Sequence, residues 1–285
     1  MTTLEARPGA PTPVLPVTFP RVVTSEWIKF RTVRATVWTL SMTVLAMVGI
    51  AALAAWSIAD LLEGSGEAMG PGDAAAQAAS FPIAGWFIAQ LVVAVLGVLV
   101  ITGEYGTGMI RSTFAAVPQR VPALLGKALV LFGVVAVVSA VAVALSWLVA
   151  LPFLGRLDLA VDLTDATSLR LLLGAPLYLA TIAVLAFAIG ALVRHSAGAL
   201  ATVLGLLLVV ETVFASLPLR FFETVSPYLP STAGQRLLAA GDESTFGGGA
   251  DAAAVLTPWQ GYAVLVAWVV VLTAAAAVLV RRRDA

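Results

Sequence analysis

The sequence of 285 residues contains no cysteine and a single histidine. The absence of cysteine excludes disulfide bonds and thiolate metal sites, and His195 alone cannot assemble a metal centre. The sequence also lacks the pattern Gly-x4-Gly-Lys-Ser/Thr, whose backbone N–H groups wrap phosphates in a P-loop. ATP binding by that route is therefore excluded, and we expect neither a cofactor nor a metal. Charge is scarce as well, at 11% of the residues.

Apolar residues make up 60% of the chain and gather in six stretches that carry almost no charge. About 22 helical residues reach roughly 33 Å, enough to cross the hydrocarbon core of a bilayer. Buried helices of a soluble protein rarely run this long without a polar stripe. We therefore predict an all-α, polytopic membrane protein. The six predicted spans are 37–59, 81–102, 128–151, 171–193, 197–217 and 259–280.

Lysine and arginine are unequally divided between the two sides of this predicted bundle. Twelve of them fall on the side that carries both termini, and four fall on the other side. The four are Arg156, Arg170, Arg220 and Arg236. The positive-inside rule then places the N- and C-termini in the cytoplasm.

The predicted domains are a tail, a surface helix and the bundle. Residues 1–20 hold five prolines and no apolar core, so we expect a disordered N-terminal tail rather than a signal peptide. Residues 21–36 repeat apolar side chains at spacings of three and four, which predicts an interfacial amphipathic helix with Lys29 reaching towards lipid headgroups. Residues 37–285 form the six-helix transmembrane domain. Its external segment, 218–258, is partly apolar and predicts short helices that cap the bundle or dip into the outer leaflet.

The segment after the second span carries the strongest functional signal. Glu104 lies at the cytoplasmic end of that span, where a carboxylate needs a partner. Arg111 is near enough to pair with it if the chain turns at residues 106–108. Pro118 ends the short helix that follows, because a proline inside a helix costs about 3 kcal/mol.

Two further basic residues of this segment, Arg120 and Lys127, can face lipid phosphates or acidic residues of a partner. Together these features predict a compact, charged, helical knob that passes motion from a soluble partner into the bundle. The alternative is an inert cytoplasmic loop that merely obeys the positive-inside rule.

This segment also resembles part of a known family, the type-2 ABC transporter permeases of high-GC bacteria. The shared pattern is an acid leaving the second span, a Gly-hydrophobic-hydrophobic-Arg turn, a short helix, Pro-x-Arg, and Gly-Lys opening the third span. Many members have threonine after the turn glycine, where this chain has Met109. The matching positions are Glu104, Gly108, Ile110, Arg111, Pro118, Arg120, Gly126 and Lys127.

The resemblance implies the permease subunit of an exporter, in a bacterial plasma membrane. It implies that a separate cytoplasmic ABC ATPase hydrolyses ATP, and that this chain is not itself an enzyme. It also implies a second permease chain, identical or different, and transport by alternating access. The cargo is not readable, although an apolar bundle suits a hydrophobic or amphipathic substrate. Nothing in the sequence points to a nucleic acid partner.

Glu211 is the only ionisable residue inside the six predicted spans. An ionised acid in lipid is costly, so we expect it to face the bundle or water, or to be protonated. It either lines the substrate route or dimer seam, or it hydrogen-bonds within the bundle. This residue keeps a rival function open, an ion-coupled carrier or channel, and a non-transporting membrane anchor is a further alternative. An intramembrane enzyme would need a cluster of polar side chains at the span ends, and this sequence offers none. His195 and Ser196 are adjacent but more typical of a turn.

Overall fold

The computed structural model describes residues 18–65, 78–116, 120–157, 159–217, 219–240 and 256–282. Within these ranges every regular element is helical, and six helices are long and apolar enough to cross a membrane. The chain is thus an all-α protein with the character of a multi-pass membrane protein. The candidate spans are Arg34–Leu61, Ala78–Thr107, Val121–Leu157, Ala166–Val193, Ser196–Ser216 and Pro258–Arg282.

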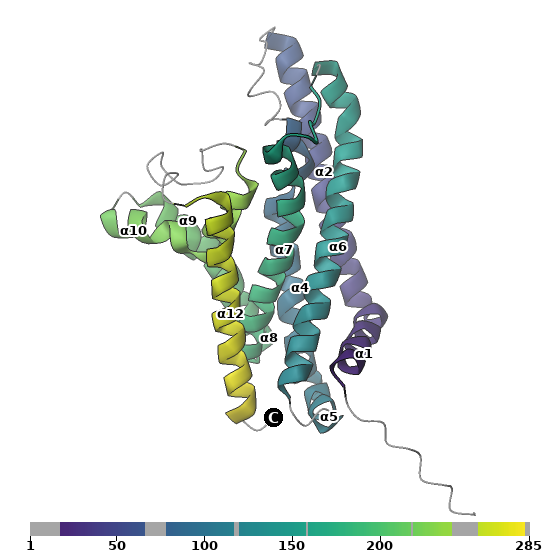
Figure 1. Ribbon diagram of the computed structural model, residues 1–285, viewed down its shortest axis with the longest axis vertical. Coiled ribbons are helices and arrows are strands. Elements are labelled where there is room, and N and C mark those ends of the chain that lie inside the picture. The colour runs from purple at the N-terminus through teal and green to yellow at the C-terminus, as the bar shows by residue number, and fades with distance from the viewer. Residues whose placement is uncertain are drawn as a thin grey trace, which may run out of the picture.

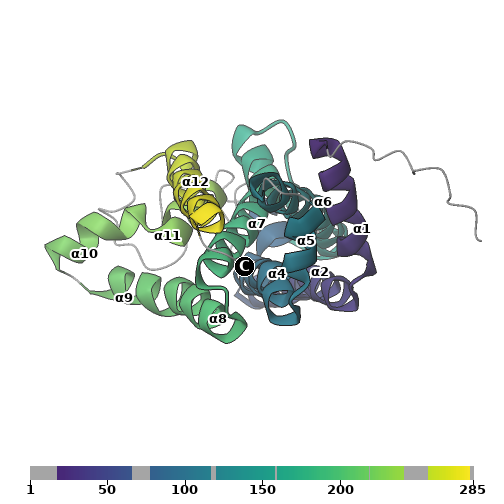
Figure 2. The same ribbon diagram turned by 90° about the horizontal axis from the view of Figure 1, so that it is seen from below.

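The helices form a tight bundle and a looser lobe, which Figure 1 shows from the side and Figure 2 from below. The bundle elements are α1 (Phe19–Thr32), α2 (Arg34–Ser65), η1 (Phe81–Ile83), α4 (Trp86–Thr107), α5 (Met109–Ala116), α6 (Val121–Leu154), η2 (Gly155–Leu157) and α7 (Ala166–Val193). The lobe elements are α8 (Ser196–Leu204), η3 (Gly205–Val210), α9 (Glu211–Ser216), α10 (Arg220–Val225), η4 (Ser226–Tyr228), α11 (Pro230–Gln235), η5 (Arg236–Leu238) and α12 (Pro258–Arg282).

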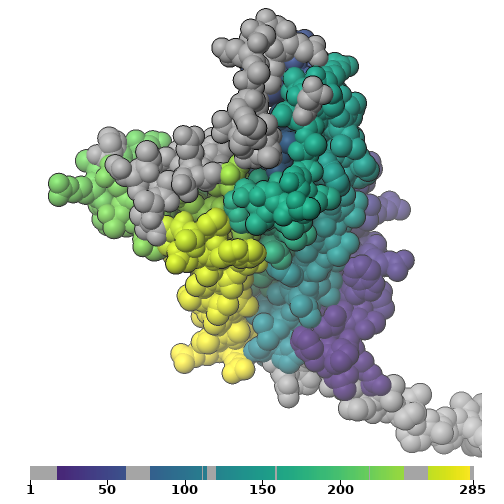
Figure 3. Space-filling model, turned by 45° about the horizontal axis from the view of Figure 1, so that its top comes forward, coloured from purple at the N-terminus to yellow at the C-terminus, as the bar shows by residue number. Residues whose placement is uncertain are grey.

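Helix α7 lies at the centre and packs against α4, α6 and α12. In its most apolar 18-residue window 83% of the residues are buried, compared with 17% for α12, which lies on the outside of the molecule (Figure 3). The α4–α7 contact is close because Gly97 has no side chain: a Cβ there would lie 2.1 Å from the carbonyl oxygen of Ala183. Small residues allow such an approach of two backbones in membrane bundles.

The predicted external helices exist within the described part of segment 218–258. They are α10, η4, α11 and η5, and α11 and η5 pack against α12 and α7. A Cβ at Gly261, near the start of α12, would lie 2.3 Å from the carbonyl oxygen of Ala233 in α11. The first half of this segment is therefore part of the folded lobe.

Helices α1 and α5 and the C-terminal end of α12 lie at the same end of the molecule (Figure 1). The predicted tail, residues 1–20, falls almost wholly outside the described residues, which begin at Thr18. A separate helix, α1, occupies most of the range predicted for the surface helix. Val33 has an extended backbone conformation, which ends α1 before α2 begins.

Candidate functional site

Helix α1 lies along the beginning of α6, where the chain has Gly126. A Cβ at Gly126 would lie only 3.1 Å from Cγ1 of Val22, so glycine lets the two helices touch. The buried face of α1 consists of Val22, Glu26 and Phe30, which recur every four residues. Trp27, from the predicted apolar stripe, is exposed and available for lipid. A carboxylate, Glu26, is therefore held between apolar neighbours and pointed at the bundle.

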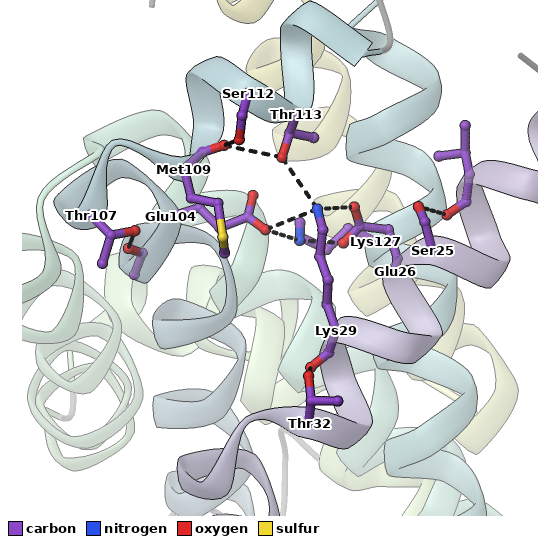
Figure 4. Close-up of polar contacts among 12 residues, drawn as sticks. Ser25, Glu26, Lys29, Thr32, Glu104, Thr107, Met109, Ser112, Thr113 and Lys127 are labelled. Atoms are coloured by element: carbon purple, nitrogen blue, oxygen red, sulfur yellow. Dashed lines mark hydrogen bonds and ion pairs between the residues drawn. The ribbon is translucent and has the colours of Figure 1, made fainter. Parts of the chain in front are cut away.

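Four charged side chains meet where α1, α4 and α6 converge (Figure 4). Lys127 Nζ donates to Glu104 Oε1 at 2.7 Å and also binds Glu26 Oε2. Lys29 Nζ lies 2.8 Å from Glu26 Oε1 and 3.5 Å from Glu104 Oε1. We refer to Glu26, Lys29, Glu104 and Lys127 as the ion cluster.

The ion cluster also holds α5. Lys29 Nζ donates to Thr113 Oγ1 in α5 at 3.2 Å, and Ile110 of the same helix is buried in the core. Gly108 separates α4 from α5 with φ of 73°, a left-handed conformation that costs glycine little. Helix α5 is thereby tied to α1 by one hydrogen bond and to the core by one apolar side chain.

The ion cluster is neutral, with two cations and two carboxylates, and three of its members are buried. Removing one partner from a buried ion pair typically costs about 3–5 kcal/mol, because a charge is left without compensation. Lys29 is the exception, with 34% of its side chain exposed. Burial acts to lower the pKa of Lys29, but its hydrogen bond with Glu26 and the charge of Glu104 outweigh burial and raise it.

The predicted site residues are thus only partly brought together. Glu104 was expected to pair with Arg111, but its described partners are Lys127 and Lys29, whereas the side chain of Arg111 and all of Pro118 lie outside the described residues. Lys127 was expected to face lipid phosphates or a partner and instead faces two carboxylates of its own chain. Lys29, expected at lipid headgroups, also turns to the cluster.

Arg120 does not belong to the ion cluster and contacts α12 instead. Its guanidinium Nη1 donates to the carbonyl oxygen of Val280, near the C-terminus of α12, at 3.2 Å. The last carbonyl groups of a helix have no partner within the helix, and a cationic side chain there is favourable. Arg120 therefore links the start of α6 to the end of α12.

Glu26 is the site residue that sequence reasoning missed. Its partner Lys127 is supplied by another helix and lies 101 positions away in the chain. One local signal was present: Glu26 lies four residues from both Val22 and Phe30, so it shares the apolar face of a helix. An acid in that position needs a buried cation.

Glu211 lies at the opposite end of the fifth span, directly after the π-helical segment η3. It is buried, and its carboxylate accepts hydrogen bonds from Ser231 N at 2.7 Å and from Thr232 Oγ1 at 3.2 Å. A π-helical segment adds a residue to the turn and so redirects the side chains that follow it. Glu211 thus accepts hydrogen bonds from two residues at the beginning of α11. Of the two roles predicted for it, this arrangement matches hydrogen bonding within the bundle.

Other polar residues singled out from the sequence occupy a turn. His195 Nδ1 accepts from Gly198 N at 3.2 Å, and Ser196 Oγ donates to Thr102 Oγ1 at 3.0 Å. The first contact lies within the connection between α7 and α8, and the second ties this connection to α4. The described part of the chain contains no group of three or more histidine, aspartate or glutamate residues that could hold a metal ion.

Comparison with known proteins gives no family assignment. The chain matches no protein-family model, and no curated protein sequence matches it.

Proposed function

We propose that this chain is the membrane subunit of an ABC exporter of the type-2 permease class. In this proposal a separate cytoplasmic ATPase supplies the energy, and two permease chains move a hydrophobic or amphipathic substrate by alternating access. The resemblance of residues 103–129 to that family motivates the assignment, and the six candidate spans agree with it.

The observation that carries the proposal is the attachment of α5. This helix of eight residues follows α4 at the end of the bundle. Thr113 binds the ion cluster through Lys29, and Ile110 is buried in the core. A force applied to α5 would reach α1, α4 and α6 together, because the ion cluster joins these helices. That is the property required of a contact surface between an ATPase and a membrane bundle.

The surface of the lobe supports a second permease chain or direct lipid contact. Large apolar side chains are exposed along α12, such as Trp268, Val270 and Val271. A bundle in lipid has no need to bury these residues, so either occupant satisfies them. The predicted setting, a bacterial plasma membrane with both termini in the cytoplasm, places α5 on the side where ATP is available.

The rival carrier or channel would need Glu211 free for a coupling ion. Both oxygens of its carboxylate accept hydrogen bonds from α11 instead. This favours a role for Glu211 in holding the outer helices over a role as an ion site.

A cross-linking experiment tests the proposal directly, because the chain has no native cysteine. Ser112→Cys places one thiol on the exposed side of α5, and Ala166→Cys places one at the exposed start of α7, at the other end of the bundle. If an ABC ATPase is encoded beside the gene of this chain, each variant is co-expressed with it, and a bifunctional thiol–amine reagent is added. We expect a cross-linked ATPase with Ser112→Cys alone.

Two results would reject the assignment. One is the absence of an ABC ATPase gene next to this one together with substrate transport by the purified chain alone. The other is a stable complex with the ATPase in which Ser112→Cys reacts no more than Ala166→Cys.

A further inference from the structure

A cavity of about 280 Å³ lies beside the ion cluster, between α1, α2, α4 and α6. Its walls are mostly apolar, and Glu26, Lys29, Glu104 and Lys127 are among its lining residues. Small-molecule sites have volumes of about 300–1,000 Å³, so this cavity lies just below that range and suits part of one slender apolar chain better than a bulky ligand. The apolar wall residues include Phe30, Val33, Leu96, Leu99, Val100 and Val130.

One atom of the ion cluster has no partner. Glu104 is buried, and its Oε1 binds both lysines, but no described residue lies within hydrogen-bonding distance of its Oε2. Leaving a buried polar atom without a partner is unfavourable, and more so when the atom is charged. Because Glu104 also lines the apolar cavity, a ligand that combines a hydrogen-bond donor with an apolar body would suit this carboxylate.

The cavity is open to the surroundings of the bundle at its apolar edge. Leu99 and Val33, which line it, are both substantially exposed. It lies at the end of the molecule where α1 and α5 are found, at the inner end of α4 that carries Glu104. The cavity can therefore be filled from the bilayer, at the depth where headgroups meet acyl chains.

We infer that this cavity binds one phospholipid with an ethanolamine headgroup. The primary ammonium of the lipid donates to Glu104 Oε2, its phosphate lies at Lys29, and one acyl chain fills the space beside Leu99. A zwitterionic head suits a neutral cluster, because each of its charges meets the opposite charge while the net charge stays zero. A choline headgroup has no N–H to donate, and a glycerol headgroup brings a net negative charge.

The bound lipid would complete the hydrogen bonding of the group that holds α5. This site requires only the bilayer and the ion cluster, so it stands or falls independently of the ATPase and of transport. It links the position of α5 to the lipid composition of the membrane.

Native mass spectrometry of the purified full chain, delipidated and then equilibrated with micelles of matched lipids, tests the inference. The probes are ethanolamine, choline and glycerol phospholipids with identical acyl chains. We expect one ethanolamine lipid to be retained in preference to the other two. Glu104→Gln keeps an oxygen for Lys127 but replaces the acceptor at Oε2 by a donor, and retention should fall about tenfold, which corresponds to about 1.4 kcal/mol.

A matched pair of glycine variants tests the place of binding without touching a charge. Gly103 lines the cavity and Gly106 lies one turn further along α4 outside it, and an added Cβ meets no heavy atom within 4 Å at either position. Gly103→Leu should displace the lipid, whereas Gly106→Leu should retain it. Equal retention of ethanolamine and choline lipids, or wild-type retention by either Glu104→Gln or Gly103→Leu, would overturn the inference.

Discussion

Lys127 Nζ donates to Glu104 Oε1 over 2.7 Å, so the second turn of α6 is tied to the last turn of α4. These two helices carry α5 between them, and the same ammonium group binds Glu26 of α1. One buried lysine thus closes the junction of three helices. Its removal leaves two buried carboxylates facing each other with only Lys29 to compensate them.

Lys127→Met should therefore be strongly destabilising, by about 3 kcal/mol in the free energy of unfolding. Lys29→Met serves as the control, because Lys29 is 34% exposed and its loss should cost only about 1 kcal/mol. Reversible unfolding of the purified variants in mixed micelles measures both values. Equal losses would show that burial of Lys127 does not set the strength of the cluster.

Alkaline pH should weaken the contact of Lys29 with its carboxylates. The pKa of Lys29 is raised above the ordinary lysine value of 10.5, so the protonated form is the one that the fold stabilises. Its contribution is then complete below pH 10.5 and is lost as the pH rises through the higher pKa of the folded state. The stability difference between wild type and Lys29→Met should be constant from pH 7 to about 10 and should shrink above it. A difference that shrinks on acidification in that range would have the wrong sign.

Gly126→Leu should push α1 away from α6. Its Cβ would already lie 3.1 Å from Val22 Cγ1, and overpacking of this kind costs about 1–3 kcal/mol. Gly133→Leu, two turns further along α6, is the matched control, because an added Cβ there meets no heavy atom within 4 Å. Thermal unfolding and protease cleavage between α1 and α2 should distinguish the two variants. No increase in cleavage for Gly126→Leu would argue against the close approach.

Glu211→Gln should loosen the outer helices. The carboxamide oxygen can still accept from Ser231 N–H, but the NH2 group then faces Thr232 Oγ1, so this hydroxyl must change from donor to acceptor and both bonds lose their charged acceptor. A loss of about 1 kcal/mol follows from the two weakened hydrogen bonds. Glu223→Gln in the exposed part of α10 is the control and should be neutral. Unchanged transport at full expression of Glu211→Gln would also exclude an essential charge at this position.

The orientation of the bundle can be checked with the two single-cysteine variants alone. A membrane-impermeant maleimide should label Ala166→Cys in intact cells, because residue 166 lies at the predicted external end. Ser112→Cys should react only after the membrane is permeabilised, because α5 is predicted to be cytoplasmic. The reverse pattern would invert the predicted topology, and with it the proposed access of an ATPase to α5.

Six helices long and apolar enough to span a membrane are predictable from the sequence, but their limits are not. The sequence predicts that the second span ends at residue 102 and that the third begins at residue 128, because charged residues follow the one and precede the other. The helices continue to Thr107 and begin at Val121, because Glu104 and Lys127 neutralise each other inside the protein. A rule based on charge shortens a helix wherever its end is buried in an ion pair.

The contacts of the candidate site were harder to predict for a different reason. Glu104 and Lys127 were both selected from their own segment, yet the residue that joins them to α1, Glu26, comes from a helix more than 70 positions earlier in the chain. The direction of Glu211 depends on a π-helical segment and on a helix 20 positions later. Periodicity reports which face of a helix is apolar, but it does not report which helix will cover that face.

The length of α6 has a mechanical consequence. Its 34 residues correspond to about 51 Å of helix, well beyond the roughly 30 Å of a hydrocarbon core. Lys127 is near one tip of this rod, and Pro152 is near the other. If α6 swung by only about 5° about the ion cluster, its far tip would move through roughly 4 Å, and α2 and α7, which pack against it, would have to follow.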